Sequence, residues 1–440
     1  MADRYVWSGA TGSGTGASWA NAHTTLSLAI TASTAGDRFF VAHDHAQTVA
    51  SALALSFKGT ASAPDTVLCA DRAGSVPPVS ADLRTTATVS TTGVSNLSLH
   101  GYFYCYGIKF QAGSAANIAN LNLPSSPSAS VIELVNCELN LNNTAASVLQ
   151  IGVTGAVQQQ VTLRNTKMQF GAVGQGVALA TGRFVWKNTA SALGGAIFPT
   201  VLFANLGVLK GTFALIEGVD LSALGSGKSI VGGDVAAAHT VVLKDCKLGA
   251  SVAISSAVTS PGGPRTLVVR SDSGDTNYRQ EVYDYTGTLT TEATIVRTGG
   301  ASDGTTSIAW KIVTTGVPKW IAPFEVFPIT IWNETVGSPI TLTVECIASA
   351  VLNNDDIWMD IEYLGTSGFP LGNFDTSGKA NVLATNAANP TSTEVWGGAL
   401  TGKFKLTKAI TPQEKGPITC YVRIGKASQT VYVDPKVTVT

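Results

Sequence analysis

The chain of 440 residues is short of charge, because Asp, Glu, Lys and Arg together make up 13% of it, about half the usual share of a soluble domain. Its 28 basic and 29 acidic residues nearly cancel, which argues against the basic surface of a nucleic-acid-binding protein. No apolar run reaches the roughly 18 residues that a membrane-spanning helix needs. The first residues also lack the basic-then-apolar order of a secretion signal.

Metal-binding patterns are absent as well. The six cysteines are scattered, with no C-x-x-C pair and no Cys/His cluster, so no zinc site is predicted. Without a secretion signal, the chain is expected to fold in a reducing compartment, with its thiols as small apolar core residues. The low charge itself indicates either extensive burial in an assembly or a β-rich protein.

An eight-residue unit recurs six times in the middle of the chain. Its first and third positions are apolar in every copy, which is the period of a strand with one buried face. Its fifth position is Gly, Asn or Asp, the residue types that best tolerate a left-handed backbone, so each strand is predicted to end in a sharp bend. The copies occupy residues 103–110, 132–139, 161–168, 184–191, 214–221 and 241–248. The predicted bend residues are Gly107, Asn136, Asn165, Asn188, Gly218 and Asp245.

The spacing of these bends predicts the fold. A constant strand–bend–strand unit with a variable period of 23 to 30 residues indicates coils joined by loops of differing length. We therefore predict an all-β chain with a right-handed, three-sheeted parallel β-helix over residues 36–277, in which the bend asparagines stack as an amide ladder. A β-sandwich with accidental similarity is the alternative, and six units with consistent columns disfavour it.

The two flanks of the solenoid differ in pattern. Residues 1–35 are predicted to form an arm and a capping helix that begins at Ser18, ends at Ala32 and covers the first coil with Trp19, Leu26 and Ile30. Residues 278–440 have longer, cleanly alternating strands, typical of an antiparallel, jelly-roll-like β-sandwich. The clearest of these strands cover residues 340–346, 357–363, 418–424 and 431–433.

Both ends of the chain resemble a known family. Residues 5–22, the Ala35-Gly36-Asp37 turn and residues 431–435 are similar to the corresponding parts of β-helix virion proteins of tailed bacteriophages. That family includes head decoration (cement) proteins and tail spikes, which are commonly trimeric. The resemblance implies a virion structural protein and a homotrimer.

Acidic residues are scarce in the central coils, which matters because glycosidic bond cleavage needs two carboxylates in one groove. Between Gly101 and Gly233 the acidic residues are Glu133, Glu138, Glu217 and Asp220. Glu133 and Glu138 lie on opposite sides of a bend, so they are expected on different faces. No catalytic residue and no enzymatic activity are predicted.

Two other groups of residues are candidates for binding. His43 and His45 would share a face on a strand and could bind a metal, but a third ligand is missing, so a structural role is preferred and no metal site is predicted. Trp332 and Trp358 could stack on sugar rings, although their place within predicted strands favours the core.

These observations favour a capsid decoration protein that binds the major capsid protein, stabilises the head shell mechanically and acts without a cofactor. On this hypothesis the protein assembles in the host cytoplasm, sits on the capsid surface, and binds neither nucleic acid nor membrane. The alternative is a tail spike or fibre adhesin that binds a host surface glycan, with or without depolymerase activity.

Overall fold

The structure, a computed structural model, consists of two compact units, Met1–Ser256 and Ala257–Thr440. The predicted boundary at residue 278 lies outside the described residues. Among the described residues, no helix is long and apolar enough to cross a membrane. The structure describes residues 1–124, 128–153, 159–180, 182–204, 213–232, 240–255, 265–269, 280–282, 287–290, 293–299, 308–314, 327–348, 357–364, 370–371, 384–385, 402–424, 428 and 430–440.

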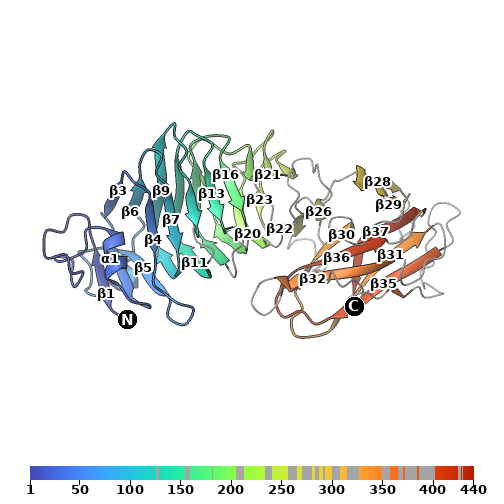
Figure 1. Cartoon of the computed structure of the whole chain (residues 1–440), viewed down its shortest axis with the longest axis horizontal. Helices are drawn as coiled ribbons and strands as arrows, with labels where there is room; N and C mark the ends of the chain where they lie inside the picture. Colours follow the sequence, from blue (N-terminus) through green and yellow to red (C-terminus); the bar gives the residue numbers. More distant parts are fainter. Residues whose placement is uncertain are drawn as a thin grey trace. The chain divides into compact units, whose positions relative to one another are not determined.

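The first unit is a right-handed parallel β-helix, as predicted, and its strands follow one another in chain order from blue to green (Figure 1). Each coil contributes one strand to each of three sheets. The first sheet contains β1 (Asp3–Val6), β2 (Arg38–Ala42), β5 (Asp65–Ala70), β8 (Tyr102–Tyr106), β11 (Ser130–Val135), β14 (Gln159–Arg164), β17 (Arg183–Thr189), β20 (Phe213–Leu221) and β22 (Thr240–Lys244).

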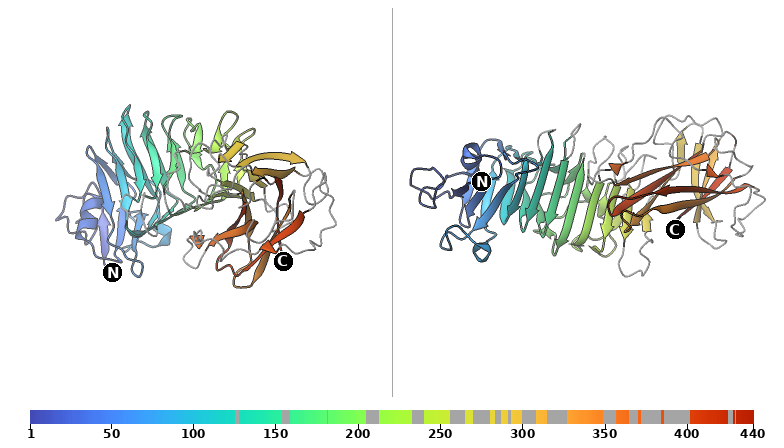
Figure 2. Two further views of the ribbon diagram at one scale, coloured as in Figure 1. Left: turned by 45° about the vertical axis from the view of Figure 1, so that its right-hand side comes forward. Right: turned by 90° about the horizontal axis from the view of Figure 1, so that it is seen from below.

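The other two sheets complete each coil, and the stacking of their strands is visible from two further directions in Figure 2. The second sheet contains β3 (Ala46–Val49), β6 (Ala87–Thr91), β9 (Ile108–Ala115), β12 (Glu138–Asn143), β15 (Lys167–Phe170) and β18 (Leu193–Gly194), and β23 (Lys247–Leu248) pairs with the end of β20. The third sheet contains β4 (Leu53–Ser56), β7 (Leu97–His100), β10 (Leu121–Leu123), β13 (Val148–Ile151), β16 (Gly176–Leu179), β19 (Val201–Phe203), β21 (Ser229–Val231) and β24 (Ala253–Ser255).

The core of the solenoid is built from the apolar columns of the repeat. Parallel register places each apolar residue directly against its counterpart in the next coil, as with Ile132 against Val161 and Leu134 against Leu163. The first and third positions of all six copies are at most 2% exposed. Trp186 is the largest of these side chains, and its indole nitrogen donates to the carbonyl of Thr166 at 2.9 Å. Burial of stacked apolar side chains, at about 25 cal/mol per Å², is therefore the main stabilisation of the coils.

The corner between the first and second sheets is formed by the bend residues. All six have a left-handed backbone, with φ between 45° at Asn165 and 79° at Gly107. The Asn165 amide nitrogen donates to Oδ1 of Asn136 at 2.5 Å, which links two successive corners. A left-handed residue turns the chain in one step, so the strands on either side keep their register.

The N-terminal cap differs in part from the prediction. The helix α1 covers only Leu26–Ala32, because Thr25 caps it: Oγ1 of Thr25 accepts from the backbone nitrogen of Leu28 at 3.2 Å. Leu26 and Ile30 are buried, as expected of a cap. The preceding residues form turns instead of helix, and there Trp19 packs edge-on against Tyr5 with ring centroids 4.8 Å apart.

The second unit is antiparallel, and its strands include the four segments predicted from their alternation. Its two larger sheets contact each other, for example through β30 (Phe327–Asn333) and β37 (Thr430–Val439). The jelly-roll topology remains a prediction. One sheet contains β27 (Gly287–Thr290), β28 (Ala293–Gly299), β29 (Ile308–Thr314), β37 (Thr430–Val439), β31 (Ile340–Ala348), β35 (Gly402–Ile410) and β34 (Ala384–Thr385). The other contains β30 (Phe327–Asn333), β36 (Gly416–Ile424), β32 (Ile357–Leu364) and β33 (Pro370–Leu371), while β25 (Arg265–Val269) and β26 (Gln280–Val282) pair with each other antiparallel.

Candidate functional site

A row of three tyrosines lies on the outer surface of the first sheet. Strand β8 reads Tyr-Phe-Tyr-Cys-Tyr, so alternation sends Phe103 and Cys105 into the core and Tyr102, Tyr104 and Tyr106 outward. The two core side chains are at most 2% exposed, whereas the three tyrosines are half-buried. Side chains two residues apart on a strand are about 6.6 Å apart, so the rings form a regular row.

The neighbouring strand β11 extends this row into a surface, which we call the tyrosine face and define by Tyr102, Tyr104, Tyr106, Val131 and Glu133. In the parallel register Val131 lies beside Tyr102, and Glu133 lies beside Tyr104. Val131 is 38% exposed, which is unusual for a valine on a strand. The face therefore combines apolar ring surface with phenol hydroxyls and one carboxylate.

The carboxylate of the tyrosine face is held by the next coil. Oε1 of Glu133 accepts from Nε of Arg164 on β14 at 2.7 Å. Burial raises the pKa of the Tyr104 phenol, and the nearby negative charge of Glu133 raises it further. Tyr104 is therefore a neutral hydrogen-bond donor at physiological pH, and the surface offers one donor-rich, weakly charged platform.

All four acidic residues that sequence analysis singled out in the central coils are ion-paired. Glu133 and Glu138 project from different sheets, as predicted, and Oε1 of Glu138 lies 2.9 Å from Nζ of Lys109 in an ion pair. Glu217 lies between Lys187 and Lys244, at 2.7 and 2.9 Å. Burial raises the pKa of Glu217, but the hydrogen bonds from these two lysines outweigh burial and hold it below its usual value. Asp220 pairs with Lys247 at 3.2 Å.

The His43-Asp44-His45 segment does not place its two imidazoles on one face. It is a turn between β2 and β3, so the strand rule for residues two apart does not apply. The His43 side chain is 37% exposed, with Nδ1 3.6 Å from Asp71, whereas His45 is 1% exposed in the interior. Among the described residues, no group of three His, Cys, Asp or Glu side chains could hold a metal ion.

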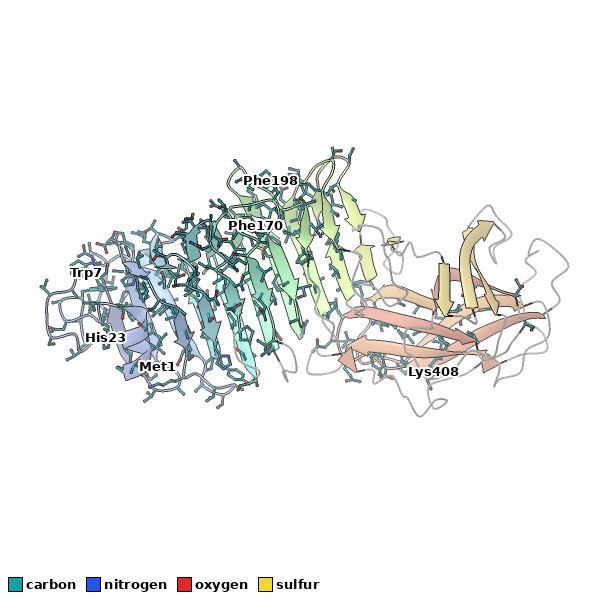
Figure 3. The ribbon with its side chains drawn as sticks, turned by 45° about the horizontal axis from the view of Figure 1, so that its top comes forward. Met1, Trp7, His23, Phe170, Phe198 and Lys408 are labelled. Carbon is teal, nitrogen blue, oxygen red and sulfur yellow. The ribbon has the colours of Figure 1, made fainter. Side chains whose placement is uncertain are left out.

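An ordered cluster of charge nevertheless surrounds this turn. The Arg72 guanidinium lies 4.0 Å from the ring centroid of Trp7 and donates to both oxygens of the Asp44 carboxylate, with the shortest distance 2.7 Å. Figure 3 shows Trp7 at the N-terminal end of the solenoid. Because each charge has a partner in the fold, the cluster supports the first coils structurally.

Of the tryptophan side chains in the second unit, the structure describes that of Trp332. Trp332 is 4% exposed, and its indole nitrogen donates to Oε1 of Glu334 at 2.6 Å. It is a core residue, as favoured from the sequence. The side chain of Trp358 lies outside the described residues.

The tyrosine row is not among the sites predicted from the sequence, although its signal is present there. Tyr104 and Tyr106 occupy the even positions of the first repeat copy, and Tyr102 precedes it by one. The same alternation that identified the core column also assigns these rings to the surface. An aromatic residue at an outward position is a stronger sign of binding than one at an inward position.

Comparison with known proteins gives matches of fold alone. No protein-family description matches the chain, and no curated protein does. Among solved structures, it is similar to the enzymatically active domain of tailspike protein 4 from bacteriophage CBA120, at 11% identity and a TM-score of 0.20, over 92% of this chain and 64% of that one. It is also similar to WceF of Pantoea stewartii, at 9% identity and a TM-score of 0.20, over 92% of this chain and 51% of that one. The chain thus spans less than two thirds of the length of either.

These neighbours correct one prediction. WceF is described as a glycan biofilm modifying enzyme with a bacteriophage tailspike-like parallel β-helix, and the other structure as an enzymatically active domain, which contradicts the prediction of a non-enzymatic protein. That prediction rested on counting carboxylates in the central coils alone, a count that leaves out Asp44, Asp71 and Asp82 of the first coils. The likeness assigns no reaction to this chain. Its parallel β-helix agrees with the resemblance to β-helix proteins of tailed phages.

Proposed function

We propose that this chain is a virion protein of the tail spike or fibre type, and that its tyrosine face binds a glycan of the bacterial surface. The row of outward tyrosines on β8 carries the proposal. A tyrosine ring offers a flat apolar surface and a hydroxyl at its tip, and it loses little conformational entropy on binding. Sugar rings present C–H faces and hydroxyls, which match that combination.

The surroundings of the row suit an extended, weakly charged ligand. Tyr102, Tyr104 and Tyr106 are fixed by a strand that pairs with β5 on one side and β11 on the other, so the rings are pre-organised. The Glu133–Arg164 ion pair supplies both a hydrogen-bond acceptor and donors at the edge of the row. A repeating chain of sugars can contact successive rings along the strand, which favours a polysaccharide over a small molecule.

The capsid decoration role expected from low charge has less support than this proposal. Shell binding calls for broad contact surfaces and makes no use of three aromatic rings aligned on one strand. Binding of the major capsid protein and a position on the capsid surface therefore stay untested predictions.

The test is binding of the purified chain to a panel of bacterial capsular and lipopolysaccharide glycans by calorimetry. Tyr104→Ala is expected to weaken binding roughly 10-fold, since one aromatic contact contributes about 1 kcal/mol or more. Tyr104→Phe should retain most of the affinity because it keeps the ring. Gln111→Ala, on the outer face of the second sheet, is the matched control and should bind like the unaltered protein.

Two results would contradict the proposal: no binding to any glycan of the panel, or equal binding by the Tyr104→Ala and Gln111→Ala variants. New reducing ends and unsaturated sugars should be measured in the same samples, with Glu133→Gln as a further variant. Their release would add a depolymerase activity, and its loss in Glu133→Gln would assign a role to that carboxylate.

A further inference from the structure

The tyrosine face lies on a short exposed stretch of the outer surface of the first sheet. Toward the N-terminus, the outward column runs from Tyr106 through Leu68 to Phe40, which is 0% exposed. Toward the C-terminus, the outward side chains of Thr162 and Val185 are 7% and 4% exposed. The exposed area between these ends is about 10 Å across the strands and about 13 Å along β8, which suits a short segment of a glycan chain.

Val131 is the most exposed of the five residues of the tyrosine face, at 38%. Val131 and Glu133 point to the same side of β11, about 6.6 Å apart, with Val131 beside Tyr102 and Glu133 beside Tyr104. An exposed aliphatic side chain next to an aromatic ring binds a methyl group well, because both apolar surfaces leave water on contact. Val131 and Tyr102 therefore form a methyl subsite at one end of the tyrosine face.

Hydrogen-bonding groups of both kinds lie next to this methyl subsite. A carboxylate has about four acceptor positions and Nε of Arg164 uses one of them, so Glu133 can accept from a ligand as well. The phenol of Tyr104 stays neutral, because burial and the charge of Glu133 raise its pKa, and it can donate. The guanidinium of Arg164 carries further N–H donors, and this side chain is 49% exposed. One acceptor and two kinds of donor therefore flank the methyl subsite.

We infer that the tyrosine face recognises the acetamido group of an N-acetylated amino sugar, an inference that rests on the glycan binding proposed above. This group has a methyl, an N–H donor and a carbonyl acceptor in fixed relation. The methyl packs on Val131 and Tyr102, the N–H donates to Glu133, and the carbonyl accepts from the Tyr104 hydroxyl or the Arg164 guanidinium. A plain hexose leaves Val131 uncovered, and a deoxy sugar brings a methyl without the N–H, so both fit less well.

Chitotriose and cellotriose are matched probes, because they share one backbone and differ in an acetamido group against a hydroxyl. Calorimetric titration of the purified chain should give chitotriose a roughly 10-fold higher affinity, since a buried methyl and a net hydrogen bond each contribute several-fold. In saturation-transfer NMR, the acetyl methyl should receive the largest saturation among the protons of chitotriose. This second measurement reports the methyl contact directly.

Val131→Thr tests the methyl subsite, because it keeps the shape and strand preference of the side chain but replaces one methyl with a hydroxyl. It should reduce the preference for chitotriose about 4-fold and leave the affinity for cellotriose unchanged. Val135→Thr is the matched control, since Val135 is outward on the same strand, beside Tyr106 and on the other side of Glu133. The control should keep the full preference, and circular dichroism should show that both variants are folded.

The inference is overturned if the two trisaccharides bind equally, if chitotriose does not bind, or if Val131→Thr and Val135→Thr change the preference to the same extent. The glycan panel distinguishes this failure from failure of the proposed function. Tyr104-dependent binding of a polysaccharide that lacks acetamido sugars would keep the tyrosine face as a glycan site and reject the acetamido group alone. If no glycan binds, both proposals fail.

Discussion

The corner between the first and second sheets is built in two ways along one solenoid. From β8 onward a single left-handed residue turns the chain, as Asn136 and Asn165 do. In the first two coils the same corner takes residues 43–45 and residues 71–86. There the geometry depends on side chains. Arg72 forms an ion pair with Asp44 and lies over the Trp7 ring, and Arg84 forms an ion pair with Asp71. Repeated corners therefore rely on backbone conformation, whereas the terminal corners depend on specific side-chain contacts.

Among the tests of this contrast, the largest loss of stability is expected when the pH is lowered, which acts on His45 in the first corner. His45 is buried, and burial lowers its pKa from 6.5 to about 4. Since the unfolded chain binds a proton at a higher pH than the folded chain, this contribution to stability is intact above pH 6.5 and is lost as the pH falls to about 4. The loss amounts to about 3 kcal/mol.

Urea unfolding between pH 7 and pH 4, followed by circular dichroism, measures this loss. His45→Gln removes the titrating group, so its stability should fall by about 3 kcal/mol less over the same range. Parallel pH profiles for the variant and the unaltered chain would show that His45 does not link pH to folding.

A smaller effect is expected at the repeated corners. Asn165→Val forces a β-branched residue into φ of 45° and removes the bond to Asn136, at a cost of about 2 kcal/mol. Asn165→Gly keeps the backbone conformation and loses only the amide bond, so it should cost about 1 kcal/mol. Urea midpoints of the two variants test the difference. Equal destabilisation would mean that the side-chain ladder, and not the backbone, decides the corner.

The smallest effect is expected from the charged cluster near the N-terminus. Arg72→Ala removes an exposed ion pair and a cation–π contact, together about 1 kcal/mol. Arg164→Ala removes a comparable exposed pair without a ring contact and should cost about 0.5 kcal/mol. Thermal unfolding at low and high salt separates the two, since salt screens the ion pair and leaves the ring contact. A larger cost for Arg164→Ala would contradict the role given to Trp7.

The sequence was informative where one residue position decides a conformation. Gly, Asn or Asp at the fifth repeat position and apolar residues at the first and third were sufficient to predict the coil and its core columns. The strands of the third sheet are only three or four residues long and vary in spacing, so their period was too short to recognise. The start of α1 depends on a cap at Thr25 that competes with an equally plausible Ser18.

The alternation of charge on the second sheet has a consequence for changes in chain length. Lys109, Glu138 and Lys167 occupy the same position on three successive coils. Deleting residues 137–165 would keep every bend and every core column in place, yet it would set Lys109 directly beside Lys167. Deleting residues 137–188 would set Lys109 against an uncharged stretch instead. Loss of these two coils together is therefore electrostatically easier than loss of one, a preference that comes from the charge column and not from the backbone.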